Sequence, residues 1–113
     1  MSTPAHVTSD QFQKTVLESQ QPVLVDFYAD WCGPCRAMAP VLEQLAAEFA
    51  GRAAIVKVNV DDEPELAGRF QIASIPTLML FRGGLIVKTI VGLTRADQLR
   101  SLLHQYSAQP ATR

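Results

Sequence analysis

The chain has 113 residues and a mass of 12.4 kDa, with 48% hydrophobic residues, 19% charged residues and a net charge of −1. A chain of this length can bury roughly two-thirds of its unfolded surface, so it can fold without metals or several disulfides. Nucleic acids and anionic membranes bind clustered basic residues, and the sequence has no such cluster. We therefore expect a single domain over 1–113 that binds neither nucleic acid nor a membrane.

The N-terminal sequence bears on where the protein works. MSTPAHVTSDQF has no basic region followed by an apolar stretch, so it does not look like a secretory signal. No window approaches the roughly 20 apolar residues that span a bilayer. If residue 1 is the native start, we expect a cytoplasmic protein; a secreted protein whose signal has been removed is the alternative.

The first elements are a helix and a strand. Residues 8–19 begin with Thr8 and carry Gln11 three places later, a capping-box pattern, and apolar residues follow at helical spacing. Residues 22–29 are an almost continuous apolar run rich in valine, as expected for a central strand covered on both faces. Asp26 interrupts this apolar run.

A second helix and strand follow. Apolar residues at helical spacing predict a helix over 34–49, with Pro40 inside it, which should kink it. Residues 53–60 read as a strand. A strand–helix–strand unit of this length implies parallel pairing through a right-handed crossover.

The rest of the chain predicts a short helix over 61–70, a hairpin over 77–92 and a closing helix over 94–106. Gly83-Gly84 between two strand-like runs is the mark of a tight hairpin. Residues 107–113 are expected to be a frayed tail. The fold class is therefore α/β: a mixed central sheet flanked by helices, built from a βαβ unit, a helix, an antiparallel hairpin and a C-terminal helix.

The two cysteines of the chain, Cys32 and Cys35, stand at the start of the predicted helix 34–49. Residues three apart on a helix have Cβ atoms ~5–6 Å apart, which permits a disulfide after modest adjustment. The unpaired N–H groups of a helix start favour an anion, so we expect Cys32 to have the lower pKa and to attack as a thiolate. Cys35, expected to be more buried, is then the resolving thiol. Pro34 suits this place because it has no N–H to leave unsatisfied.

Other interpretations of the cysteines are two buried structural thiols or half of a zinc site. A zinc site usually takes four ligands, and His6 and His104 lie far from the cysteines in the sequence. We therefore favour redox chemistry.

WCGPC at 31–35, preceded by VLVDFYAD, resembles the active-site segment of the thioredoxin family. KVNVDD (57–62), SIPTLMLFRGG (74–84) and VG (91–92) occur at similar places and in the same order, so the resemblance covers nearly the whole chain. It implies the thioredoxin fold and a protein dithiol–disulfide oxidoreductase that reduces disulfides of target proteins through Cys32 and Cys35.

The resemblance also implies roles for other residues. Asp26 matches a buried acid that helps to move the proton of the resolving thiol, and burial among apolar residues should raise its pKa. Lys57 matches a lysine near that acid. Pro76 matches a cis proline facing the disulfide, and Ile75 before it would offer backbone groups to a substrate strand. An apolar docking patch would consist of Trp31, Gly33, Pro34, Val60, Ile75, Gly92 and Leu93.

Each of these residues also has a plainer interpretation. Asp26 could be a hydrogen-bonded structural residue, and Lys57 could be exposed to solvent. Trp31 could belong to the core, and Pro76 could be an ordinary trans turn proline.

Three residues depart from the family pattern. Tyr28 stands where many members carry a second tryptophan, Ser74 where glycine is common, and Leu93 where a smaller residue is usual. Ser74 and Leu93 border the docking patch, so they bear on partner preference rather than on the reaction.

The implied partners are disulfide-containing target proteins and a flavin-containing thioredoxin reductase that draws on NADPH. The chain itself is expected to bind no cofactor and no metal, and to be a monomer. Two alternatives remain: a thiol oxidase or isomerase on the same fold, and a non-catalytic module or subunit that binds a partner through the apolar patch.

Overall fold

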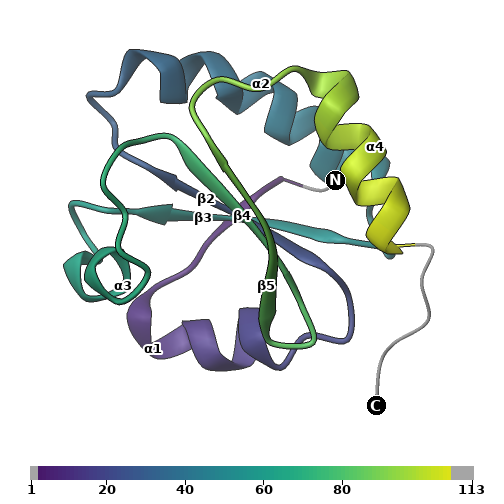
Figure 1. The fold of residues 1–113 in the computed structure, drawn as a ribbon, viewed down its shortest axis with the longest axis horizontal. Coiled ribbons are helices and arrows are strands. Elements are labelled where there is room, and N and C mark those ends of the chain that lie inside the picture. The colour runs from purple at the N-terminus through teal and green to yellow at the C-terminus, as the bar shows by residue number, and fades with distance from the viewer. Residues whose placement is uncertain (1–2, 108–113) are drawn as a thin grey trace.

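The computed structural model describes residues 3–107, which form a five-stranded sheet with helices on both faces (Figure 1). The strands are β1 (Ala5–His6), β2 (Val23–Tyr28), β3 (Ala54–Asn59), β4 (Thr77–Arg82) and β5 (Leu85–Val91). The helices are α1 (Ser9–Phe12), a π-helical segment η1 (Gln13–Leu17), α2 (Gly33–Glu48), α3 (Pro64–Arg69) and α4 (Ala96–Ser107). None of these helices has the length and apolar character needed to cross a membrane.

The sheet is mixed, as the sequence predicts. Its strand order is β1-β3-β2-β4-β5, with β1 and β2 parallel to β3 and with β4 antiparallel to both β2 and β5. The parallel β2–α2–β3 unit and the β4–β5 hairpin are both confirmed. Gly83 and Gly84 have φ values of 60° and 81°, which is the left-handed conformation that a tight hairpin turn requires of both residues.

The core lies in two layers, one on each face of the sheet. In Figure 1, α2 and α4 cover one face and α1 and α3 cover the other. Leu42 and Leu45 of α2 and Leu99 of α4 are fully buried against the first face. Phe12, Phe27 and Phe81 fill the second layer and belong to one group of aromatic rings with Phe70. These layers hold β2 rigidly at the centre of the sheet.

Two elements near the N-terminus differ from the prediction. The helix predicted over 8–19 begins as expected, and the Thr8 N–H donates to Gln11 Oε1 at 3.1 Å, but after Phe12 the chain continues as η1. The two-residue strand β1, which pairs with Val56 and Lys57 of β3, was not predicted because so short a segment has no periodicity to detect.

The other predicted elements are present with small changes in their ends. Pro40 lies on the exposed side of α2, inside its span, and the kink expected there stays a prediction. Ser107 ends α4, and the remainder of the predicted tail, 108–113, lies outside the described residues.

Candidate active site

The two cysteines lie where the carboxyl end of β2 meets the N-terminus of α2. Cys32 caps the helix: its backbone is extended (φ −86°, ψ 112°), and its Sγ accepts a hydrogen bond from the Cys35 N–H at 3.2 Å. This sulfur occupies the place that a serine or aspartate oxygen takes in an ordinary N-cap. Pro34 fits the first turn because the N–H it lacks would have had no partner within the helix. Backbone N–H groups at the start of α2 therefore point toward the sulfur atom of Cys32.

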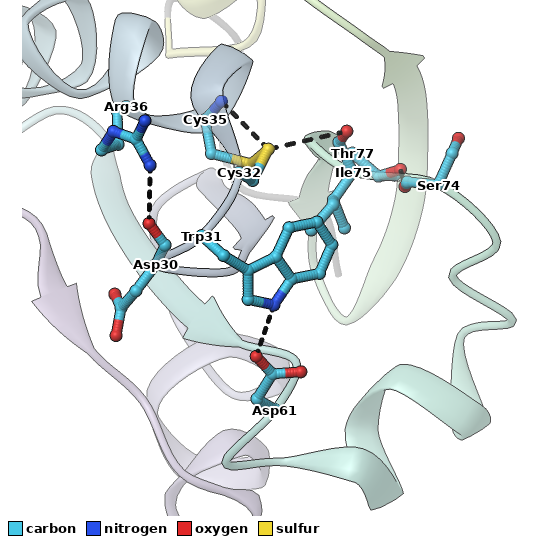
Figure 2. Close-up of a disulfide and its surroundings, with 9 residues drawn as sticks. All are labelled: Asp30, Trp31, Cys32, Cys35, Arg36, Asp61, Ser74, Ile75 and Thr77. Carbon is cyan, nitrogen blue, oxygen red and sulfur yellow. Dashed lines mark hydrogen bonds between the residues drawn. A yellow bond between two sulfur atoms is a disulfide. The ribbon is translucent and has the colours of Figure 1, made fainter.

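Cys32 and Cys35 form a disulfide, with their Cα atoms 5.2 Å apart (Figure 2). This separation lies within the usual range for disulfides. The prediction that Cys35 is the more buried residue is wrong, because each cysteine is 4% exposed. Both belong to a small buried cluster with Tyr28 and Ala29, against which Val60 and Ile75 pack. Any difference in their roles must come from the cap position of Cys32.

The loop before β4 lies against the disulfide. The Ile75–Pro76 peptide bond is cis, as the resemblance implies, and the Ile75 carbonyl oxygen lies 3.9 Å from Cys32 Sγ (Figure 2). The Pro76 carbonyl accepts a hydrogen bond from the Gly92 N–H at 2.8 Å. Thr77 Oγ1 donates to the Ser74 carbonyl at 2.6 Å. These bonds fix the loop between the disulfide and the end of β5.

Trp31 is a surface residue, not a core residue, since 68% of it is exposed. Its indole Nε1 donates to Asp61 Oδ2 at 2.8 Å, which holds the ring beside the disulfide (Figure 2). The ring lines one side of a groove with a volume of about 500 Å³. The groove is lined by Trp31, Val60, Pro64, Ala67, Ile72, Ala73, Ser74 and Ile75. We refer to these eight residues as the Trp31 groove.

Sequence reasoning placed Trp31, Val60 and Ile75 in a docking patch, and the structure brings them together in this groove. Ser74, predicted to border the patch, lines the groove. Sequence reasoning missed Asp61 and the other groove residues from α3 and the following loop, which are Pro64, Ala67, Ile72 and Ala73. The position of these groove residues in the sequence could have indicated them, because they lie between KVNVDD and SIPT, two segments that already carry predicted site residues. Of the other patch residues, Gly33 and Pro34 are exposed at the start of α2, and the Gly92 N–H bonds to the Pro76 carbonyl. Leu93, the residue after Gly92, is 63% exposed.

Asp26 is buried beneath the α2 face of the sheet. It is 1% exposed, and among the described residues neither of its carboxyl oxygens has a hydrogen-bond partner. Burial raises the pKa of Asp26 from 3.8 to about 6, and the positive charge of Lys57 partly opposes this rise. The interpretation of Asp26 as a hydrogen-bonded structural residue is therefore wrong. A carboxyl group that titrates close to neutral pH can take up and release a proton.

Lys57 is the register partner of Asp26 on the neighbouring strand β3. It is half-buried rather than fully exposed. Lys57 lines a pocket of about 260 Å³ together with Cys35, and Arg36 and Ala39 of α2 form part of the same wall. Lys57, whose charge acts on Asp26, therefore shares a pocket with Cys35.

No group of three or more histidine, cysteine, aspartate or glutamate side chains that could hold a metal ion occurs within residues 3–107. What the arrangement offers is an exchangeable pair of sulfur atoms, a buried carboxyl group and a groove with apolar walls beside them.

Comparisons with known proteins agree with this chemistry. The family model of thioredoxin matches residues 3–105. Thioredoxin 1 of Nostoc sp. is 46% identical over 94% of this chain and 99% of its own length, and the thioredoxin of Haemophilus influenzae is 45% identical with the same coverage. The thioredoxin of Allochromatium vinosum is 49% identical over 87% of this chain and 92% of its own. The chain therefore belongs to the thioredoxin family and is a protein dithiol–disulfide oxidoreductase with Cys32 and Cys35 as its redox pair.

Proposed function

We propose that the protein acts as a reductant, in which the Cys32–Cys35 dithiol passes two electrons to disulfides of target proteins. The observation that carries the exchange chemistry is the hydrogen bond from the Cys35 N–H to Cys32 Sγ at the N-terminus of α2, and membership of the thioredoxin family supports the reducing direction. In the reduced protein, this N–H and the helix dipole stabilise a thiolate on Cys32, the form of cysteine that attacks disulfides.

The reaction has two exchange steps. The Cys32 thiolate attacks one sulfur of the target disulfide; an S–S bond to the target forms, and the second target sulfur leaves as a thiolate that takes a proton from water. Cys35 then loses its proton and attacks Cys32 Sγ. The mixed disulfide breaks, the Cys32–Cys35 bond forms, and the target leaves with both cysteines reduced.

We assign the proton of Cys35 to Asp26. No group within residues 3–107 donates a hydrogen bond to Asp26, and its pKa of about 6 makes it largely ionised at neutral pH and yet a usable base. Lys57 lies between Asp26 on the sheet and the pocket that Cys35 lines, so solvent in that pocket provides a path for the proton.

Target proteins dock on the face that carries Trp31. A substrate strand pairs with the backbone at Ile75, next to Cys32 Sγ, and an apolar side chain of the target fills the Trp31 groove. Gly33, Pro34, Gly92 and Leu93 contact the target around the disulfide. Ser74 lines the groove and Leu93 is exposed, so these two residues can adjust which targets bind.

A complete cycle needs an electron donor. We propose a thioredoxin reductase as the partner that restores the dithiol, which gives the protein a place in electron transport. A protein that must remain reduced works in a compartment where thiols are kept reduced, so we place it in the cytoplasm, as a monomer with residues 1–113 in one domain.

Disulfide reduction with insulin as the target and dithiothreitol as the electron source tests the reaction. Cys32→Ser should abolish activity, whereas Cys35→Ser should abolish turnover but trap the target on Cys32 as a mixed disulfide. If the biological activity depends only on binding a partner and survives both substitutions while disulfide reduction is lost, the non-catalytic binding module is favoured. Equilibration with glutathione buffers tests the direction: a Cys32–Cys35 couple more oxidising than glutathione would make the protein an oxidase or isomerase instead.

A further inference from the structure

Three polar residues lie in one row across three strands. His6 of β1 is the register partner of Lys57 of β3, and Lys57 is the register partner of Asp26 of β2. Register partners in neighbouring strands point to the same face of the sheet. Leu78 continues the row on β4 and belongs to the core layer beneath α2, so all these side chains lie on the face that α2 covers.

Tyr28, two residues after Asp26 on β2 and therefore on the same face, contacts His6 and Lys57 of this row. Its hydroxyl forms a hydrogen bond with His6 Nδ1 at 3.1 Å, and the two rings meet edge to face with centroids 5.9 Å apart. The Lys57 Nζ lies 4.1 Å from the centroid of the Tyr28 ring, within the range of a cation–π interaction. Burial raises the pKa of Tyr28, so the hydroxyl stays protonated at neutral pH.

The Lys57 ammonium group is in contact with the face of the Tyr28 ring. Within residues 3–107, Lys57 forms no ion pair shorter than 4.0 Å and Asp26 accepts no hydrogen bond. Lys57 therefore acts on Asp26 through space, and the strength of that effect depends on where its long side chain is held. Without the ring, the side chain is free to turn into the pocket of about 260 Å³ that it lines.

We propose that Tyr28, anchored through its hydroxyl to His6, is a positioning residue that holds the Lys57 ammonium group near Asp26. The effect of Tyr28 on the reaction rests on the proposed function of Asp26. The effect of Tyr28 on the ionisation of Asp26 does not, because that ionisation can be measured directly. The phenol of Tyr28 offers both a ring face for Lys57 and a hydroxyl for His6.

The surroundings of Asp26 contain few other charges that could replace Lys57. Its neighbour on β4 is the apolar Leu78. Asp30 and the α2 residue Arg36 line the pocket beside Lys57, and the Arg36 guanidinium donates to the Asp30 carbonyl at 2.9 Å. The substitutions below leave both residues in place.

The test follows the ionisation of Asp26 in the oxidised protein by NMR of its isotope-labelled carboxyl carbon. In Tyr28→Leu, the titration midpoint of Asp26 should rise by about 0.5 pH unit, because the stabilising charge is less well held. In a Lys57→Met background, the same substitution should not raise it. A midpoint that falls in Tyr28→Leu overturns the proposal, because the ring would then act mainly by excluding water. A midpoint that rises equally with and without Lys57 also overturns it, because the effect would then not depend on the Lys57 charge.

Two milder variants keep the proposal testable if Tyr28→Leu does not fold. His6→Phe removes the hydrogen bond between His6 and the Tyr28 hydroxyl, and Tyr28→Phe removes that bond together with the interaction between the hydroxyl and the Asn59 side chain. Each should raise the midpoint by a smaller amount than Tyr28→Leu, and the double variant should raise it no further than Tyr28→Phe. Additive or opposite effects would overturn the anchoring role of His6. His104→Phe, which alters the other histidine, is the matched control and should leave the midpoint unchanged.

The pH profile of disulfide reduction separates this inference from the proposed function. A profile that moves with the Asp26 midpoint supports both. If the midpoint moves while the profile does not, the role of Tyr28 stands and the proposed role of Asp26 in proton transfer fails.

Discussion

Replacing Asp26 by asparagine should stabilise the protein at neutral pH and have a much smaller effect at acid pH. The reason is the buried carboxyl group, whose pKa burial raises from 3.8 to about 6. Between these pH values the folded protein keeps a proton that the unfolded chain has released. The free energy of unfolding of the wild-type protein therefore falls as the pH rises through this window, and the loss is complete above pH ~6.

The size of the effect follows from the same two values. Each pH unit corresponds to about 1.4 kcal/mol for one proton, so the window between pH 3.8 and about 6 corresponds to about 3 kcal/mol. An asparagine at this site does not titrate, and any fixed cost of burying its amide is the same at every pH. The difference in stability between Asp26→Asn and wild type should therefore grow by about 3 kcal/mol, in favour of the variant, from about pH 3.5 to about pH 8.

The measurement is urea unfolding of both oxidised proteins across this pH range, followed by far-ultraviolet circular dichroism. Asp97→Asn is a control of opposite sign. A hydrogen bond from Arg95 lowers the pKa of Asp97, so the free energy of unfolding of wild type should increase relative to that of Asp97→Asn as the pH rises. Parallel curves of stability against pH for wild type and Asp26→Asn would refute the reasoning, because Asp26 would then titrate alike in the folded and unfolded chains.

Three further substitutions probe the docking face and the fold. Trp31→Ala should lower kcat/KM for a protein disulfide about tenfold. Reduction of a small soluble disulfide and the Tm should stay nearly unchanged, because the ring is 68% exposed. Equal losses on both substrates would argue against a docking role for Trp31. Leu42→Ala, at a fully buried position beneath α2, should lower the free energy of unfolding by about 2–5 kcal/mol in urea. Gln71→Gly should raise it by about 0.5–1 kcal/mol, because Gln71 has a φ of 55° that strains a residue with a Cβ; Gln71→Ala, measured alongside, should give no such gain.

The elements that could be predicted from the sequence are those with a long local pattern. The apolar run of β2 and the helical spacing of α2 each extend over several residues, so periodicity identifies them. The start of η1 could not be found in this way, because apolar residues four or five apart suit an α-helix and a π-helical turn alike. The strand order could not be predicted either, since the pairing of β1 with β3 depends on contacts between residues far apart in the chain.

The same distinction applies to the site. Two cysteines three apart before a helical pattern are a local signal, and this signal led to the N-cap position of Cys32. The hydrogen bond between Trp31 and Asp61 spans 30 positions, and that between His6 and Tyr28 spans 22. The contact between Cys32 and the Ile75 carbonyl spans 43, and it helps to explain why Cys32 is as buried as Cys35. No local pattern reports such contacts.

The short spacing of the cysteines also has a consequence for how the protein survives repeated use. A disulfide stabilises a fold mainly by restricting the unfolded chain, and this effect shrinks with the length of the loop that it closes. With a sequence separation of only three, the loop-closure term is about 2 kcal/mol, against about 4.7 kcal/mol for a 100-residue loop. The two core layers contain neither cysteine. Opening the bond therefore leaves the packing of both layers in place, and the same folded molecule can gain and lose its electron pair many times.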